Sequence, residues 1–260
     1  MDILNYSDGH IKEIVSKLLN ENIEVVPIGN HELQRHLVYI VKNESGIIGV
    51  VKIYYKKNRW NREVASLRVL EESGVKAPKI LKTFDFFGNW DENGKSIDNI
   101  KDFSRLFRKN VDEVLKELFD QHLEEEPLQR QCAEILKGKL NLVDDVKVSY
   151  LHNGDFGERN ILVKKVDNKW ELSALIDFEH CIPYDRDSEI IDCYYKLTDE
   201  NQKFAEAFKL GYEKYMKFSN NLGKKKQLYE LYRGLSICSW AKIQAPDYYW
   251  EGINILKKYS

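Results

Sequence analysis

Residues 151–163 read Leu-His-Asn-Gly-Asp-Phe-Gly-Glu-Arg-Asn-Ile-Leu-Val, and residues 175–179 read Leu-Ile-Asp-Phe-Glu. Together they hold an aspartate, an asparagine five residues later, and a second aspartate that ends an apolar run. Phosphoryl transfer from a nucleotide needs a carboxylate to accept the proton of the attacking hydroxyl. It also needs an amide and a carboxylate to hold a metal ion. The pattern therefore indicates Asp155 as the base, and Asn160 and Asp177 as the metal ligands.

The apolar runs beside this motif predict how its polar residues meet. Residues 161–163 and 172–176 are typical of two short strands, and residues 164–169 of a polar turn between them. Such a hairpin would place Asn160 and Asp177 close together at one end. The alternative is structural, because aspartate and asparagine side chains often bond nearby backbone in turns. One such residue at a strand end is usually structural, whereas three at this spacing favour a function.

The motif resembles that of a known family. Residues 152–160, followed by Ile-Asp-Phe-Glu-His at 176–180, are similar to the aminoglycoside phosphotransferase family, which are small-molecule kinases with a protein-kinase-like fold. The family has His-x-Asp at this point. Residues 152–155 of this chain instead read His-Asn-Gly-Asp, as if one residue were inserted. In the family's later Gly-Asp-Pro-x-x-Asp-Leu motif, Asp185 matches and Glu189 replaces the second aspartate.

Composition narrows the class of protein. The chain has 260 residues, of which 43% are hydrophobic, and this suffices for one large domain or two small lobes. The net charge of −2 argues against a nucleic-acid binder, which usually carries a basic excess. No apolar run approaches a membrane span, and no signal peptide is evident. The four cysteines lack a paired metal spacing and fit a reducing cytoplasm. We therefore expect a cytoplasmic protein that binds neither nucleic acid nor membrane.

The amino-terminal part predicts a helix followed by a small sheet. Residues 7–19 have helical spacing of apolar positions, and three strand-like runs with short connections follow at 23–28, 37–41 and 47–55. Short connections favour an antiparallel sheet. Gly29 lies between the first two strands, where a phosphate-covering loop would need backbone N–H groups close to a nucleotide. A plain hairpin loop explains this glycine equally well.

One charged residue stands inside an apolar strand. Lys52 has apolar neighbours on both sides and so needs a negative partner, which ATP phosphates would provide. Val50 shares its face and could touch an adenine. Glu63 lies on the apolar face of the next helix and requires a cation; Lys52 is the predicted partner, and the resemblance implies the same pair. The alternatives are an edge-strand lysine that prevents aggregation, and a solvent pair of Glu63 with Arg59 or Arg62.

The remainder of the chain predicts helices and leaves two surface features open. Helical patterns cover 104–122, 128–140, 188–196, 200–218 and 225–242. Residues 223–226 read as a solvated basic loop. The aromatic residues 248–250 could stack on a sugar-like substrate, although aromatic residues at helical spacing more often belong to the core.

These observations predict a bilobal α+β protein-kinase-like fold, with a sheet lobe at 1–81 and a mainly helical lobe at 82–260. The resemblance implies Mg²⁺-dependent transfer of the ATP γ-phosphoryl group to a hydroxyl of a small molecule. The acidic residues Asp185, Asp187 and Glu189, together with the acidic stretch at 112–126, could favour a cationic acceptor such as an aminoglycoside or amino-alcohol, or could be solvated. Nothing in the sequence sets an oligomeric state.

Three other classes compete with this interpretation. One is a kinase-fold protein that binds a nucleotide or a partner with little turnover. A protein kinase is disfavoured, because Phe178 and Glu179 follow Asp177 where Phe-Gly would stand, and no Ala-Pro-Glu follows. The third class is a scaffold protein without catalytic function, which would not need the charged and amide residues of the motif in this order.

The sequence after residue 81 departs from the family pattern, in which a hinge strand and a helix border the adenine. Either residues 79–87 form the last strand and residues 88–97 a stunted hinge, or the hinge strand and its helix are absent, and we expect the second. The adenine would then have fewer backbone partners, so we expect weak nucleotide affinity and poor discrimination between ATP and GTP.

Overall fold

The computed structural model describes residues 6–31, 36–72, 74, 102–148 and 150–260. The chain divides into two compact units, Met1–Ile97 and Asp98–Ser260. The predicted α+β class is confirmed, with an antiparallel sheet in the first unit and mostly helices in the second. The boundary predicted after residue 81, and the absent hinge predicted there, both lie outside the described residues.

The amino-terminal unit contains the predicted helix and sheet. Its elements are α1 (Asp8–Leu19), β1 (Glu24–Ile28), β2 (His36–Asn43), β3 (Gly46–Tyr54) and α2 (Lys57–Glu72). The three strands pair in the order β1-β2-β3, and both pairings are antiparallel. The Ser7 side chain caps α1 by accepting a hydrogen bond from the backbone N–H of His10 at 3.3 Å. Such a cap satisfies an N–H that has no partner within the helix.

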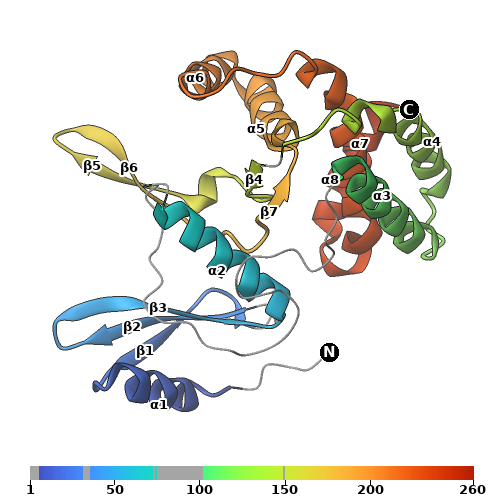
Figure 1. Ribbon diagram of the computed structural model, residues 1–260. Coiled ribbons are helices and arrows are strands. Elements are labelled where there is room, and N and C mark those ends of the chain that lie inside the picture. Colours follow the sequence, from blue (N-terminus) through green and yellow to red (C-terminus); the bar gives the residue numbers. More distant parts are fainter. Residues whose placement is uncertain (1–5, 32–35, 73, 75–101, 149) are drawn as a thin grey trace. The chain divides into compact units, whose positions relative to one another are not determined.

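The two faces of this sheet have different roles. Ile11 and Val15 of α1 pack against Leu37, Tyr39 and Val41 of β2 to form a buried core. In the antiparallel register, Ile53 pairs with Leu37 and Val51 with Tyr39, and these residues of β3 also pack on that core. Because side chains alternate along a strand, Val50, Lys52 and Tyr54 of β3 point to the other face. Figure 1 shows α1 and α2 on opposite sides of the sheet.

The carboxy-terminal unit is built from helices and two sheets of two strands each. Its elements are α3 (Phe103–Phe119), α4 (Glu126–Lys137), β4 (Tyr150–His152), β5 (Ile161–Val166), β6 (Lys169–Leu175), β7 (Ile182–Tyr184), α5 (Arg186–Glu200), α6 (Gln202–Tyr212), α7 (Leu222–Gln244) and α8 (Pro246–Lys257). Strand β4 pairs with β7, and β5 pairs with β6, both antiparallel.

Helix α7 forms the centre of this unit. Leu228, Leu231 and Leu235 are fully buried at helical spacing, and the helix packs against α3, α5 and α8. The prediction of a solvated loop at 223–226 is wrong, because these residues belong to the first turns of α7. Helix α8, which the sequence pattern did not separate, begins at Pro246; proline is favoured in the first turn because it lacks the N–H that would be unpaired there.

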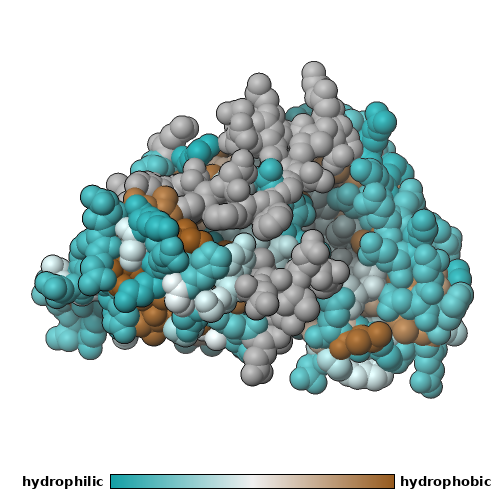
Figure 2. Space-filling view, turned by 90° about the horizontal axis from the view of Figure 1, so that it is seen from below, coloured by the Kyte–Doolittle hydropathy of each residue, from teal (hydrophilic) through white to brown (hydrophobic). Residues whose placement is uncertain are grey.

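The surface reflects the charged composition. On the face shown in Figure 2, hydrophilic residues predominate and hydrophobic ones form small patches. Within the described ranges, no helix is both long and apolar enough to cross a membrane.

Candidate active site

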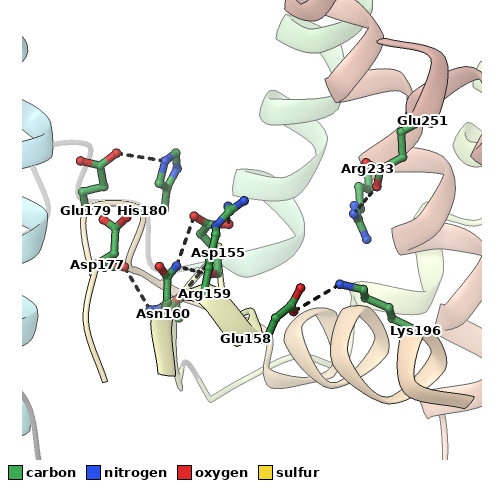
Figure 3. A network of polar contacts seen from close by, with 12 residues as sticks. Asp155, Glu158, Arg159, Asn160, Asp177, Glu179, His180, Lys196, Arg233 and Glu251 are labelled. Atoms are coloured by element: carbon green, nitrogen blue, oxygen red, sulfur yellow. Dashed lines mark hydrogen bonds and ion pairs between the residues drawn. The ribbon is translucent and has the colours of Figure 1, made fainter. Parts of the chain in front are cut away.

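The β5–β6 hairpin brings the predicted metal ligands together, as expected. Ile161 pairs with Leu175, and the backbone N–H of Ile176 donates to the carbonyl of Asn160 at 3.0 Å. Asn160 and Asp177 therefore leave the two strands at the same end of the hairpin (Figure 3). The strands are longer than predicted, and the turn is tighter. Asp167 and Asn168 connect them with positive φ values of 47° and 61°, as in the tight turns preferred by hairpins.

Asp155 lies beside Asn160 at this hairpin end. The amide nitrogen of Asn160 donates to the backbone carbonyl of Asp155 at 2.8 Å, and it lies 3.4 Å from the carboxylate atom Oδ2. The other carboxylate oxygen, Oδ1, accepts a hydrogen bond from Nη2 of Arg159. Because the amide nitrogen is used within the protein, the amide oxygen of Asn160 is the atom that could coordinate a cation. An amide oxygen and a carboxylate are ligands that suit Mg²⁺.

Asp177 has an unusual backbone conformation. Its φ is +65°, in the left-handed region that side-chain-bearing residues seldom occupy. Its carbonyl accepts a hydrogen bond from the Asn153 amide nitrogen at 3.5 Å, which ties it to the loop that carries Asp155. Strained residues of this kind cost about 1–3 kcal/mol each and cluster at functional sites. The conformation therefore supports a functional role for Asp177 independently of the sequence motif.

A tight turn accommodates the residue that is inserted relative to the family motif. The side chain of Asn153 accepts a hydrogen bond from the backbone N–H of Asp155 at 3.0 Å, and Gly154 has a φ of +76°. A Cβ atom at Gly154 would lie 3.1 Å from the carbonyl oxygen of His180. This position therefore requires glycine both for its backbone angle and for its close packing.

Glu189 holds this turn from α5. Its carboxylate accepts hydrogen bonds from the backbone N–H of Asn153 at 3.0 and 3.1 Å and of Gly154 at 3.3 Å. Burial raises the pKa of Glu189 to about 7, against the effect of these bonds. Glu189 therefore positions the loop that carries Asp155, and the prediction that it could face a cationic acceptor is wrong.

His152, the histidine of the shifted motif, is a partly buried packing residue whose two ring nitrogens are buried. It ends β4, and its ring centroid lies 5.3 Å from that of Tyr184. Within the described part of the chain, neither ring nitrogen has a hydrogen-bond partner. Burial lowers the pKa of His152 to about 4, although Asp185 opposes this effect. The imidazole is therefore uncharged near pH 7.

The ion pair predicted in the amino-terminal unit is present. Nζ of Lys52 lies 2.8 Å from Oε2 of Glu63, and the two side chains are only 19% and 12% exposed. The alternative of a solvent-exposed pair is therefore wrong. Tyr54 donates its hydroxyl to the same carboxylate oxygen at 2.5 Å, and its ring lies 5.0 Å from Nζ of Lys52. Sequence reasoning missed Tyr54, although its position two residues after Lys52 places it on the same face.

The two other predicted nucleotide contacts stay predictions. Val50 lies on the Lys52 face of β3 and is 61% exposed. Gly29 follows β1 with a φ of +81°, which favours glycine, and a Cβ there would meet open space. The backbone N–H of Val38 in β2 donates to Nε2 of His31 at 3.2 Å, which ties the residues just after β1 to β2. Residues 32–35 lie outside the described ranges.

A second acidic cluster proves to be structural. Nζ of Lys225 lies 2.6 Å from Asp185 and 2.9 Å from Asp187, and all three side chains are buried. The hydroxyls of Tyr229 and Ser219 donate to the same two carboxylates at 2.6 and 2.7 Å. Asp185 also caps α5. These aspartates therefore join α5 to α7, and the prediction that they form a solvated or acceptor-binding face is wrong.

The aromatic run of α8 divides between core and surface. Tyr249 is fully buried, and its hydroxyl donates to Glu125 at 2.6 Å. It therefore belongs to the core, as the alternative to sugar stacking predicted. Tyr248 and Trp250 stay partly exposed.

Comparison with known proteins bears on the fold. No family model matches the sequence, and no curated protein matches it. Among solved structures, the chain is similar to a thermostable mutant of aminoglycoside phosphotransferase APH(4)-Ia in its apo form. The TM-score is 0.66 at 10% identity, and 95% of this chain and 98% of the other are covered. A ternary complex of such a mutant with AMP-PNP and hygromycin B gives a TM-score of 0.60 at 11% identity, covering 96% and 98%.

A second enzyme gives the same result. The GDP complex of wild-type aminoglycoside 2'-phosphotransferase-IIIa has a TM-score of 0.60 at 14% identity, covering 97% of this chain and 98% of the other. These identities are too low to transfer a function. They show that the chain has the fold of aminoglycoside phosphotransferases, so the predicted resemblance is confirmed for the fold.

Proposed function

We propose that this protein is a phosphotransferase that moves the γ-phosphoryl group of ATP to a hydroxyl of a small molecule, either aminoglycoside-like or an amino-alcohol. The observation that carries the proposal is the meeting of Asp155, Asn160 and the strained Asp177 at one hairpin end. The kinase-like fold supports it, because similar solved structures contain AMP-PNP with hygromycin B, or GDP. The four cysteines form no disulfide, which supports a cytoplasmic location.

Each residue at the hairpin end has a distinct role in this proposal. Asp155 orients the acceptor hydroxyl and accepts its proton, within hydrogen-bond reach. Asn160 and Asp177 hold Mg²⁺, which when bound neutralises charge on the phosphate oxygens. The hydrogen bonds from Asn160 to the Asp155 carbonyl, and from Asn153 to the Asp177 carbonyl, fix these groups relative to one another.

The amino-terminal unit contributes a cation in this proposal. Lys52 contacts nucleotide phosphates, and Glu63 together with Tyr54 fixes the lysine. Val50 contacts the adenine, and Gly29 lets the β1–β2 connection approach the phosphates. An exposed valine on the same face as the lysine is consistent with such a contact.

Calorimetric titration and a turnover screen test the proposal. We expect Mg²⁺-dependent binding of ATP and release of ADP with at least one member of a panel of amino sugars and amino-alcohols. Asp177→Asn should weaken the Mg²⁺-dependent part of nucleotide binding, and Lys52→Met should weaken nucleotide binding with or without metal. Glu171→Gln, an exposed acid-to-amide change on β6 away from the motif, is the matched control and should behave like the parent.

The outcomes separate the proposal from its alternative. Binding of Mg-ATP without turnover of any acceptor would favour a catalytically weak kinase-fold binding protein. Nucleotide binding that is indifferent to Mg²⁺, Asp177 and Lys52 would contradict the assignment of the site.

A further inference from the structure

Arg159 forms an ion pair with the proposed base that stability does not explain. It belongs to the short 3-10 turn Glu158–Asn160, four residues after Asp155, and its Nη2 donates to Oδ1 of Asp155. The arginine side chain is 72% exposed and the aspartate side chain 30%. Exposed pairs at this spacing contribute little to folding, about 0–1 kcal/mol. A guanidinium on the reactive carboxylate therefore calls for a chemical explanation.

We propose that Arg159 is a catalytic residue whose guanidinium moves from Asp155 to the oxygens of the transferred phosphoryl group during the transfer. This inference rests on the proposed function and names a group that the sequence motif did not assign. The exposure of Arg159 leaves its side chain free to change rotamer, because few protein atoms enclose it.

The distances in the loop limit where the phosphorus can be. An acceptor hydroxyl must come within about 2.6–3.2 Å of a carboxylate oxygen of Asp155 to pass on its proton. The reacting atoms of a productive complex are about 3–3.5 Å apart, so the phosphorus lies one such step beyond the hydroxyl oxygen. Arg159 already bonds Oδ1, and so its guanidinium needs only a small displacement to reach a phosphoryl oxygen.

The charge balance of the step shows what the guanidinium does. A lone pair of the acceptor oxygen forms the new P–O bond, and the hydroxyl proton passes to Asp155. The bond from the γ-phosphorus to the β–γ bridging oxygen breaks, and its electron pair leaves with ADP. Asp155 loses its negative charge as it takes the proton, so its attraction for Arg159 falls. The phosphoryl oxygens are then the nearby anions that a guanidinium can bind through two N–H groups.

The neighbouring cations of this unit are held elsewhere. Lys196 lies 3.5 Å from Glu158, and Arg233 lies 2.8 Å from Glu251 and 3.6 Å from Asp192. Figure 3 shows the Lys196 and Arg233 pairs to one side of the group formed by Asp155 and Arg159. Among the described cations of the carboxy-terminal unit, Arg159 is thus the one that pairs with the proposed base.

The test compares Arg159→Gln and Arg159→Lys with a matched control. Arg130 also pairs at four-residue spacing with an acid, Glu126, at 2.6 Å, and it is 58% exposed on α4, so Arg130→Gln removes the same kind of pair away from the hairpin end. Three quantities are measured on the full chain: kcat, the affinity for Mg-ADP with and without aluminium fluoride as a mimic of the transferring phosphoryl group, and the melting temperature.

We expect Arg159→Gln to lower kcat on the order of 10³-fold, the lower end of the range for an arginine that contacts a transferring phosphoryl group. The affinity for Mg-ADP with aluminium fluoride should fall by a comparable factor while the affinity for Mg-ADP alone stays unchanged. Arg159→Lys should restore part of both losses, because it keeps the charge without the planar fork. Arg130→Gln should match the parent in kcat and in both affinities.

Two results would overturn the inference while leaving the proposed function intact. A rise in kcat for Arg159→Gln would mean that the arginine only blocks the base. An unchanged ratio of the two affinities, with an active parent, would mean that it only supports the loop. A parent that transfers phosphate to no acceptor would instead overturn the proposed function, and this inference with it.

Discussion

The carboxy-terminal unit contains two clusters in which aspartate meets a cation, and they differ in exposure. Lys225 is enclosed with Asp185 and Asp187, with side-chain exposures of 7%, 5% and 3%. The side chain of Arg159 is 72% exposed, and that of Asp155 is 30% exposed. A buried charge is costly unless it is paired, whereas a pair with an exposed partner contributes little to stability. The difference separates a cluster that holds helices together from one that is available for chemistry.

The largest expected effect on stability tests the buried cluster. Lys225→Met should lower the free energy of unfolding by about 3–5 kcal/mol, because the buried carboxylate of Asp185 loses its cation and that of Asp187 keeps only Arg186, 4.0 Å away. Urea unfolding followed by circular dichroism measures this loss. The double variant Lys225→Met with Asp187→Asn should recover part of it, since one carboxylate charge is then removed. A loss below about 1 kcal/mol would show that the cluster is not the structural link described here.

A second prediction concerns the effect of His152, which lies just before the Asp155 loop, on stability. Its pKa is about 4 in the folded protein and 6.5 when exposed, so the unfolded state binds more protons between these values. Stability is therefore lost as the pH falls from about 6.5 towards 4. His152→Phe keeps a ring against Tyr184 but cannot titrate. The difference in unfolding free energy between variant and parent should shift in favour of the variant by about 2 kcal/mol between pH 7 and 4.5.

Urea titrations of both proteins at the two pH values measure this shift. A pH-independent difference would mean that His152 titrates in the folded protein as it does in water.

The smallest expected effect concerns the exposed cluster. Arg159→Gln should change the free energy of unfolding by less than about 1 kcal/mol, as should Arg130→Gln on α4, because the arginine of each pair is mostly exposed. Parallel urea titrations of the two variants measure it. A loss for Arg159→Gln that approaches the loss for Lys225→Met would remove the distinction between the two clusters.

Sequence reasoning succeeded where local spacing decides the geometry. A strand alternates its side chains and a hairpin joins its own ends, so Asn160 and Asp177 could be placed together, and Lys52 could be placed on one face of its strand. The partner of Lys52 lies eleven residues away across a short connection, which also limits the choice.

Sequence reasoning failed where a contact joins residues that are far apart in the chain. Lys225 stands in a Gly-Lys-Lys-Lys run that looks solvated, and its partner Asp185 lies 40 residues earlier. Glu189 could be aligned with the family motif, but its bond to the N–H of Asn153 depends on how α5 packs. The pairing of Arg159 with Asp155 depends on side-chain direction in a 3-10 turn, which residue spacing alone does not fix.

The central claim is that Asp155 serves chemistry and not stability, and Asp155→Asn tests it most directly. The substitution keeps the shape of the side chain and removes its ability to accept the proton. With an acceptor that the parent turns over, ADP release and urea unfolding are measured for both proteins under identical conditions. The account predicts that kcat falls by about 10²–10⁴-fold while the free energy of unfolding stays within about 1 kcal/mol of the parent. An Asp155→Asn variant that turns over at the parental rate, or one that loses activity only because it unfolds, would contradict the account.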